Sequence, residues 1–274
     1  MVCLRWLSLG LQNIARIREP SMLLEINGLT KHFGGLVAVQ RFSMQINEGE
    51  IVGLIGPNGA GKTTIFNLIT GVHRATGGTI KFAGKDITGK KPHEIAKLRI
   101  ARTFQLNPLF GEFTVLENVS ASFHLHPRSS LLDIYFNTAT YRHNEASILE
   151  QSLEILKLVG LDKMRDELAK NLPHGHQKML GMARALAVKP KLLLLDEPLG
   201  GMNPNEINFT ISAIRKTQRQ GVTILLVEHN MRIMDLCEKV IVINFGQKIA
   251  EGLPEEVREN KEVIQAYLGG EKVA

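Results

Sequence analysis

The sequence has little of several features that mark special classes of protein. Its 274 residues include two cysteines, Cys3 and Cys237, too few for a disulfide framework or a cysteine-based metal site, so a reducing compartment is the natural assumption. Aromatic residues make up only 5%, and no aromatic motif of the kind that reads RNA is present. Its best apolar runs, 192–195 and 224–227, are far shorter than the roughly 20 residues that span a bilayer. We therefore expect that the chain does not cross a membrane by itself.

The charge of the chain is also unremarkable in its pattern. Lys and Arg number 33 against 27 acids, which gives a net charge of +6. Such a surplus can favour nucleic acids or anionic membranes, but these cations are scattered, so a solvated surface is the better account. We therefore expect no nucleic-acid partner. The 44% hydrophobic and 22% charged fractions are those of a globular domain, which excludes a wholly disordered or fibrous chain.

The first residues are predicted to be an extension of the folded domain. Polar residues interrupt the weakly apolar stretch, and no small-residue cleavage pattern follows, so a signal peptide is not expected. We expect residues 1–21 to be disordered, with Met22 as an alternative first residue. An amphipathic membrane-surface helix is the competing interpretation. It would present Leu4, Leu7, Leu11 and Ile14.

Stretches typical of β-strands alternate with helical ones at both ends of the chain. This alternation favours an α/β fold with a mainly parallel sheet covered by helices. Strands are predicted over residues 23–26, 42–46, 50–55, 79–82, 191–196, 222–227 and 239–243, and helices over 62–70, 205–220 and 262–267.

The middle of the chain has a different pattern. Between about residues 106 and 188 the strongest periodicities are helical, including a Met- and Ala-containing stripe over 179–187. We interpret this region as a helical insertion in the α/β domain. Residues 124–144 show no clear period and are predicted to be irregular.

One segment fits the phosphate-loop pattern G-x-x-x-x-G-K-[ST] in full, between a predicted strand and a predicted helix. A chance Gly-rich turn is the alternative. Glycines let backbone N–H groups turn inward around phosphates, and the helix N-terminus adds a positive field. Lys62 would reach the β and γ phosphates, and the Thr63 hydroxyl would bind Mg²⁺. The segment consists of Gly56, Pro57, Asn58, Gly59, Ala60, Gly61, Lys62 and Thr63, and Thr64 follows it.

A second motif is a run of leucines that ends in two acids and a proline, over residues 191–198. The leucines indicate a strand buried on both faces, and ligands of open α/β sheets lie at the carboxyl ends of such strands. Asp196 would complete the Mg²⁺ shell, and Glu197 would take a proton from the water that attacks the γ-phosphate. An acid pair before proline is by itself more often a solvated turn. Together with the phosphate loop it indicates a nucleoside triphosphatase.

Three further features indicate which kind of nucleoside triphosphatase this is. Gln105 stands where the α/β pattern gives way to helices, residues 172–177 directly precede the predicted helix that ends near Val188, and His229 ends a later strand. A strand-end glutamine is usually solvated, and a strand-end histidine is more often structural. Their order relative to the two strong motifs favours functional roles.

With these motifs in this order, the sequence resembles the ATP-binding subunits of ABC transporters from residue 23 to 268. The resemblance implies that Gln105 links the γ-phosphate and Mg²⁺ to a helical subdomain. It implies that His229 contacts the γ-phosphate and orients the attacking water. Phe33 falls where the family places an aromatic ring that stacks on adenine, and a core phenylalanine is the competing account.

The same resemblance implies the fold and its division. We expect a P-loop NTPase (RecA-like) core with a mainly parallel sheet, an antiparallel β subdomain and an inserted α-helical subdomain. Residues 22–270 would form a single ATPase domain. Its nucleotide-binding core would comprise 22–105 and 189–270, and its helical subdomain 106–188.

The family signature Leu-Ser-Gly-Gly-Gln is altered here. Only Leu172 and Gly175 remain, because Pro173, His174 and His176 replace the serine, the first glycine and the glutamine. In the family this loop acts across a dimer, on the partner's γ-phosphate, and Gly175 keeps one position of close approach. A neutral His176 would replace the glutamine as a hydrogen-bonding group. In the loop that crosses the dimer interface in the family, asparagine stands at residue 203, where many members have aspartate.

A narrower resemblance is to the LivG-type ATPases of branched-chain amino-acid importers. It rests on the segments 33–39, 102–118, 201–204 and 263–268. It implies an ATPase that is peripheral to the cytoplasmic face of the plasma membrane and couples ATP hydrolysis, with Mg²⁺, to uptake. The implied partners are permease subunits, bound through the helical subdomain, a second ATPase subunit, identical or related, and indirectly a solute-binding protein.

Four other functions remain open from the sequence. The same ATPase could energise another transport task, such as lipid export or import of urea or other amino acids. A soluble ABC-type ATPase acting on DNA or ribosomes usually has a long coiled-coil insertion or a duplicated cassette, and this chain has neither. A nucleotide kinase would lack the series of Gln105, signature loop and His229. A nucleotide-gated binding module without turnover is favoured only by the altered signature.

Overall fold

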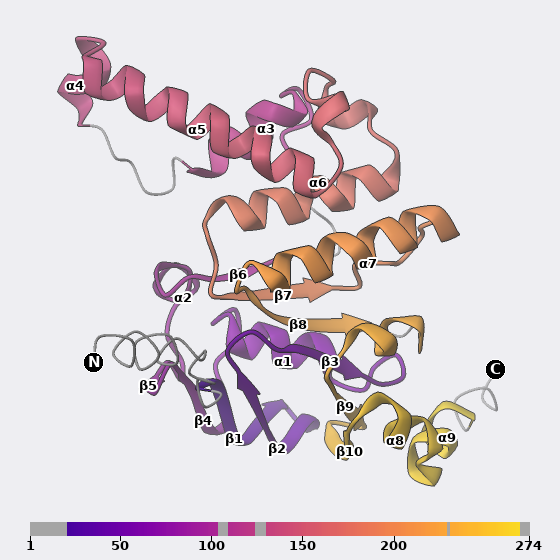
Figure 1. Ribbon diagram of the computed structural model, residues 1–274. Helices are drawn as coiled ribbons and strands as arrows, with labels where there is room; N and C mark the ends of the chain where they lie inside the picture. Colours follow the sequence, from indigo (N-terminus) through magenta and orange to yellow (C-terminus); the bar gives the residue numbers. More distant parts are fainter. Residues whose placement is uncertain (1–20, 104–108, 124–129, 229–230, 269–274) are drawn as a thin grey trace, which may run out of the picture.

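The structure is a computed structural model of the chain. It describes residues 21–103, 109–123, 130–228 and 231–268, so all but the last residue of the predicted N-terminal extension lies outside it. Two sheets and a layer of helices lie one above another, with helix α1 (Lys62–Ile69) between the sheets (Figure 1). Among the described residues, no helix is both long and apolar enough to cross a bilayer.

The larger sheet has the order β10-β9-β3-β8-β7-β6. Its strands β9, β3, β8, β7 and β6 run parallel, and β10 is antiparallel at one edge, so the predicted mainly parallel sheet is confirmed. The strand bounds are Ile51–Ile55 (β3), Ile100–Arg102 (β6), Leu192–Asp196 (β7), Thr223–Glu228 (β8), Lys239–Asn244 (β9) and Gln247–Gly252 (β10).

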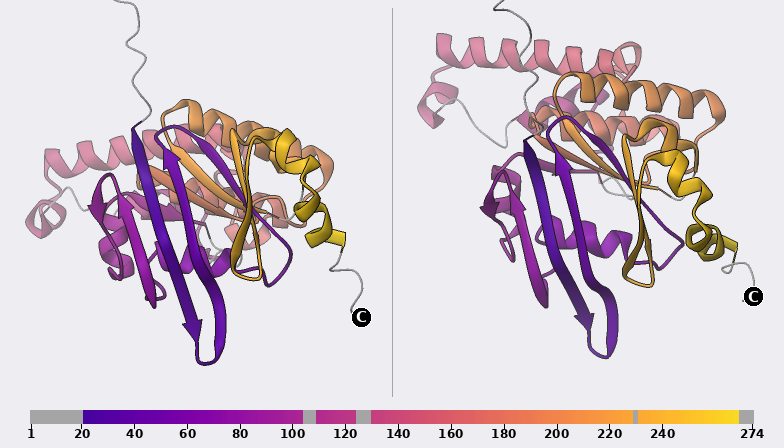
Figure 2. Two further views of the ribbon diagram at one scale, coloured as in Figure 1. Left: turned by 90° about the horizontal axis from the view of Figure 1, so that it is seen from below. Right: turned by 60° about the horizontal axis from the view of Figure 1, so that its bottom comes forward.

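The smaller sheet has the order β2-β1-β4-β5 and is antiparallel, which confirms the second predicted β unit. Its two long strands form a hairpin that extends well past the larger sheet (Figure 2). The predicted strands 23–26 and 42–46 are therefore only the buried parts of longer ones. The strand bounds are Met22–Phe33 (β1), Leu36–Asn47 (β2), Gly77–Phe82 (β4) and Lys85–Asp86 (β5).

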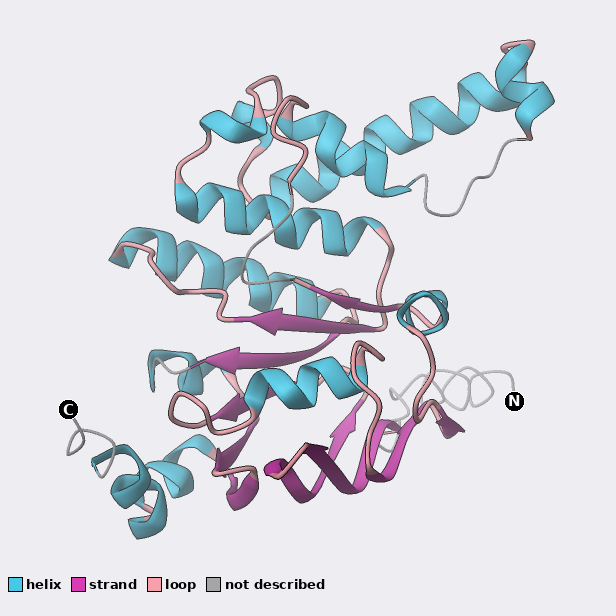
Figure 3. Ribbon diagram, turned by 180° about the vertical axis from the view of Figure 1, so that it is seen from behind, coloured by secondary structure: helices cyan, strands magenta, loops and turns pink. Residues whose placement is uncertain are grey.

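The helices α3 to α6 form a layer above the larger sheet, which we call the helical layer (Figures 1 and 3). Helix α7 lies between this layer and the sheet, while α2, α8 and α9 cover edges. The helix bounds are Pro92–Lys97 (α2), Val115–Phe123 (α3), Leu131–Tyr135 (α4), Ala139–Leu158 (α5), His174–Ala187 (α6), Pro204–Arg219 (α7), Pro254–Glu259 (α8) and Lys261–Leu268 (α9). Short 3-10 turns occupy Asp162–Met164, Ala169–Asn171 and Met231–Leu236.

The prediction that residues 124–144 are irregular is wrong for the part that the structure describes. Helix α4 begins after Ser130, whose side chain accepts a hydrogen bond from the Asp133 N–H, and α5 begins after Thr138, which caps it likewise. Helix α4 and the start of α5 project from the molecule, while the end of α5 packs against α3 and α6 (Figure 3). The projecting part buries no continuous apolar stripe, so periodicity does not mark it, whereas its caps do.

Two hydrophobic cores meet at the larger sheet. Alternate side chains of β7 point to opposite faces, so Leu193 and Leu195 pack with the helices, while Leu192 and Leu194 pack with α1 and the antiparallel sheet. Strands β3, β8 and β9 divide their side chains in the same way. The strand ends that carry the polar motifs are therefore held from both sides.

Replacement of Leu194 by alanine should lower the free energy of unfolding by about 2–5 kcal/mol, because Leu194 is fully buried and would leave a cavity. Leu132→Ala on α4, where the side chain is 69% exposed, should change it by about 0.5 kcal/mol or less. Urea titrations of both variants measure the difference. Equal losses would contradict the assignment of the core.

Candidate functional site

The phosphate loop connects β3 to α1, as the sequence predicts. Gly61 has a φ of 106°, in the left-handed region, and a Cβ there would come within 2.7 Å of the Ala38 carbonyl oxygen. Only glycine satisfies both constraints. Helix α1 has no acidic residue in its first turn, so no carboxylate there cancels the positive field at its N-terminus. This end of α1 suits an anion such as a phosphate.

Lys62 folds back into the phosphate loop. Its Nζ donates hydrogen bonds to the carbonyl oxygens of Gly56 at 2.6 Å and Pro57 at 2.9 Å, and only 6% of the residue is exposed. Burial lowers the pKa of Lys62, and the carboxylates of Glu197, Asp196 and Glu228, in decreasing order, act against that shift. The ammonium is thus held between the loop and the acids, where it can meet a phosphate oxygen.

The register of the parallel strands brings the phosphate loop close to the acid pair at the end of β7. Ile55, which precedes the loop, pairs with Glu228 on β8, and Val227 on β8 pairs with Asp196 on β7. The carboxyl ends of these three parallel strands therefore form one edge, as expected for a ligand site of an open α/β sheet. Lys62, Asp196 and Glu197 meet at this edge.

Asp196 forms a buried ion pair. Its Oδ2 lies 2.8 Å from the guanidinium of Arg102, and both side chains are 5% exposed. The other arm of Arg102 donates to Asn67 Oδ1 at 2.6 Å, and its guanidinium lies over the ring of Phe66. The Asp196 N–H donates to Thr103 Oγ1 at 3.2 Å. Arg102 thus ties the carboxylate of β7 to helix α1.

Glu197 follows Asp196 in an unusual backbone conformation. Its φ of 46° is left-handed, and its N–H donates to the Val227 carbonyl oxygen at 2.9 Å. A non-glycine residue in this region costs roughly 1–2 kcal/mol, so the surrounding contacts must fix it there. The carboxylate is part of the charged group around Lys62.

These residues offer the donors that a nucleotide with Mg²⁺ needs. The loop supplies N–H groups and an ammonium for phosphates, while exposed Thr63 supplies a hydroxyl and Asp196 a carboxylate, both hard oxygen ligands. Thr64 follows in the first turn of α1 and is half-buried. The donor set therefore fits the predicted group.

The structure does not test every predicted site residue. Gln105 and His229 lie outside the described residues, although strand β8 ends at Glu228, directly before His229. Phe33 is 41% exposed, which excludes the core account of this ring. The ring lies edge-on to His73, with centroids 5.2 Å apart, and the Lys31 ammonium lies 4.7 Å above it. Its contact with adenine remains a prediction.

The altered signature loop leads into helix α6. Pro173 is the N-cap and Gly175 lies in the first turn, where a Cβ would come within 2.7 Å of Glu206 Oε1 on α7. The Nδ1 atom of His176 is buried and has no hydrogen-bond partner among the described residues. Asn203 caps α7 by accepting from the N–H groups of Asn205 and Glu206. A side chain at position 175 would therefore displace the carboxylate of Glu206, which is the flexible end of its side chain.

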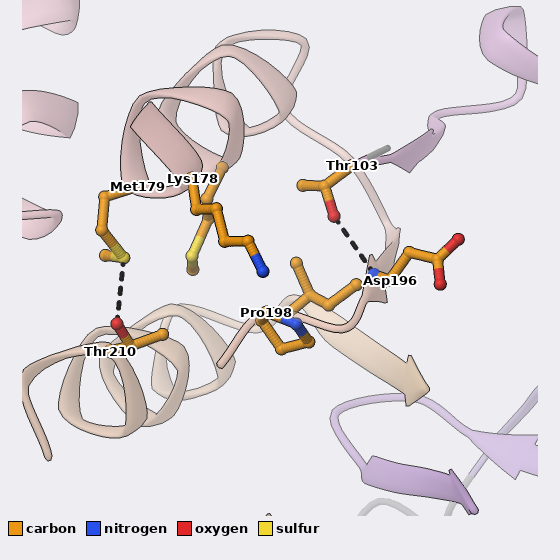
Figure 4. Close-up of a pocket in the computed structure, with 8 residues that line it drawn as sticks. Thr103, Lys178, Met179, Asp196, Pro198 and Thr210 are labelled. Carbon is orange, nitrogen blue, oxygen red and sulfur yellow. Dashed lines mark hydrogen bonds between the residues drawn. The ribbon is translucent and has the colours of Figure 1, made fainter. Parts of the chain in front are cut away.

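Three site residues were missed by reasoning from the sequence. Arg102 holds Asp196, Glu228 is fully buried at the end of β8, and Lys178 reaches from α6 toward the segment that follows Asp196 (Figure 4). A charged residue at the end of an otherwise apolar strand is a signal for Glu228 and Arg102. Lys178 gives no such signal, because a lysine on a helix is usually solvated.

Comparison with known proteins gives a consistent picture. The family model described as ABC transporter matches residues 39–200, and one described as branched-chain amino acid ATP-binding cassette transporter matches residues 247–273. The high-affinity branched-chain amino acid transport ATP-binding protein BraF of Pseudomonas aeruginosa is 41% identical over 90% of this chain and 98% of its own length. The corresponding LivG of Escherichia coli is 39% identical over the same shares.

Solved structures are similar as well. The crystal structure of the ADP conformation of an ATP-binding cassette of an ABC transporter has a TM-score of 0.79 and 33% identity. The similarity covers 90% of this chain and 99% of that one.

Arg102→Met should lower the free energy of unfolding by about 3–5 kcal/mol, because it leaves the buried carboxylate of Asp196 without its cation. Arg165→Met removes an exposed pair with Asp166 and should cost about 1 kcal/mol or less. The double variant Arg102→Met/Asp196→Asn should recover part of the loss. Chemical denaturation measures all three, and equal effects of the two single variants would contradict the buried pair.

Proposed function

The chain belongs to the ATP-binding family of ABC transporters, and from this premise we propose that it is the ATP-hydrolysing subunit of an importer of branched-chain or related amino acids. The observation that carries the proposal is the convergence of Lys62, Asp196 and Glu197 at the carboxyl ends of β3, β8 and β7. The names of the similar proteins and the family match at residues 247–273 support the amino-acid cargo.

The proposed reaction divides among these residues. The phosphate-loop N–H groups and Lys62 would hold the β and γ phosphates, and Thr63 and Asp196 would hold Mg²⁺, which would neutralise charge on the phosphates. Glu197 accepts a proton from a water whose oxygen attacks the γ-phosphorus. The bond from this phosphorus to the bridging oxygen breaks, and ADP leaves with the electron pair.

Other proposed roles come from the resemblance to the family. Gln105 would sense the γ-phosphate and Mg²⁺, His229 would orient the attacking water, and Phe33 would stack on adenine. Hydrolysis of a phosphate needs little covalent chemistry from the protein, so positioning by these groups should matter as much as the base.

We infer the binding sites of the proposed partners from exposed residues of the structure. Gly175, at the start of α6, would face the γ-phosphate bound to a second ATPase subunit. The tip of the helical layer is apolar and exposed at Leu132, Tyr135 and Phe136, which are 69%, 82% and 68% exposed. An exposed apolar group of this kind supports docking of a permease subunit there. The ATPase would thus be peripheral to the cytoplasmic face of the membrane, with a solute-binding protein acting on the other side.

Glu197→Gln should lower the turnover of ATP by roughly 10² to 10⁴-fold, because an amide cannot accept the proton of the attacking water. Steady-state release of phosphate in the presence of Mg²⁺ measures this. Glu150→Gln, at an exposed position on α5, is the matched control and should leave turnover unchanged. Near-normal hydrolysis by Glu197→Gln would rule out Glu197 as the base.

The same variant should also trap the ATP-bound pair of subunits, since hydrolysis can no longer release it. Its solution mass should shift from monomer to dimer when Mg²⁺-ATP is added, and ADP should not produce the shift. A protein that binds ATP yet stays monomeric would contradict a self-sufficient homodimer. The remaining interpretation would then be a pair with a related ATPase subunit.

A further inference from the structure

A half-buried cation on α6 contacts the loop that follows Asp196. Lys178, on the first turns of α6, donates a hydrogen bond from Nζ to the carbonyl oxygen of Glu197 at 2.8 Å. Figure 4 shows its side chain extending from α6 toward the segment that contains Pro198, while Thr103 accepts a hydrogen bond from the N–H of Asp196, directly before that segment. Lys178 thus contacts the proposed base through the backbone carbonyl of Glu197 and not through its carboxylate.

A buried anion holds the next turn of the same loop. The carboxylate of Glu228, which is fully buried, accepts a hydrogen bond from the Leu199 N–H at 2.7 Å. Charge-assisted hydrogen bonds of this kind are about twice as strong as neutral ones. The loop from Glu197 to Gly200 is therefore fixed at two backbone groups by two side chains of opposite charge.

The loop needs this support because of its backbone. Glu197 is left-handed, with a φ of 46°, and it precedes Pro198, whose ring restricts the conformation of the residue before it. A residue in such a conformation relaxes unless its neighbours hold it. Rotation of the Glu197 backbone would redirect its carboxylate. The contact with Lys178 opposes that rotation.

Gly200 makes room for the ammonium. A Cβ at this position would lie 3.0 Å from Lys178 Nζ, and the φ of Gly200 is outside the left-handed region. An alanine would therefore fit the backbone but displace the end of the lysine side chain. Gly200→Ala thus perturbs Lys178 without strain in the loop itself.

The charges around Lys178 favour its protonated, cationic form. Burial lowers the pKa of Lys178, and the carboxylates of Glu228, Glu197 and Asp196 counteract the shift. The side chain is only partly buried, so its charge is stabilised by these acids and by residual solvent.

We propose that Lys178 is a positioning residue for the general base: it fixes the Glu197 carbonyl and thereby aims the Glu197 carboxylate. Lys178 lies one turn after Gly175 on the same face of α6, so a movement of α6 reaches the base through one side chain. The proposal rests on the function proposed above, in which Glu197 is the base and α6 faces a second subunit. The proposal adds a connection, within one chain, between helix α6, which follows the signature loop, and the residue that accepts the proton, Glu197.

The first test compares Lys178→Met with wild type in steady-state ATP hydrolysis. The variant keeps most of the side-chain volume but removes the donor, so kcat should fall about tenfold to a hundredfold, the loss that a misplacement near 1 Å causes. The KM for ATP and the affinity for a fluorescent ATP analogue should stay within about twofold, because Lys178 does not touch the phosphate loop. Lys178→Arg should restore most of kcat. Lys170→Met, in the helical layer but paired with exposed Glu112, is the matched control and should resemble wild type.

The second test is a double-mutant cycle with Gly200→Ala. This variant alone should lower kcat, about threefold to tenfold, because it displaces the ammonium. In the Lys178→Met background it should have little further effect, since the group that it displaces is gone. If Lys178→Met does not fold, Gly200→Ala alone decides, and an unchanged kcat overturns the proposal.

The remaining outcomes separate this inference from the proposed function. An unchanged kcat in Lys178→Met, a loss confined to KM, or additive effects in the cycle would each overturn the role of Lys178 while leaving Glu197 as the base. A wild-type protein without ATPase activity, or a Glu197→Gln variant with full activity, would instead overturn the function on which the inference rests.

Discussion

Buried charge at the carboxyl edge of the larger sheet is the constraint on which the rest of the structure depends. An ammonium, Lys62, and the carboxylates of Asp196, Glu197 and Glu228 share a region with little access to water. A buried ion without a partner costs several kcal/mol, so each group here is held by another charge or by backbone. The guanidinium of Arg102 and the ammonium of Lys178 complete this arrangement.

The surrounding layers keep that edge rigid. Leucines on both faces of β7 lock the strand that presents Asp196, and α1 is enclosed between two sheets. Polar groups in such a setting have few alternative conformations, because close-packed neighbours leave no room for them. A site fixed in this way can use binding energy for positioning, which is what transfer of a phosphoryl group requires.

The sequence predicted the parts that follow from local pattern. Apolar runs and turn residues placed the buried strands β3, β7 and β8, and the spacing of the phosphate loop placed Lys62 and Thr63. Helix α4 and the start of α5 were missed because they carry no apolar stripe, although Ser130 and Thr138 are regular caps, whereas the leucine periodicity marked the later part of α5 as helical. Arg102 and Lys178 were missed for another reason. Their partners, Asp196 and the Glu197 carbonyl, are 94 and 19 residues away along the chain, and only the three-dimensional fold pairs them.

The long helix α5 has a mechanical consequence. Twenty residues of α-helix extend about 30 Å, and α4 with its exposed aromatic pair, Tyr135 and Phe136, lies at the far end. A tilt of about 10° at the packed end of α5 would therefore carry that tip through about 5 Å. The projecting geometry therefore enlarges a small tilt at the packed end of α5 into a displacement of several ångströms at its exposed aromatic tip.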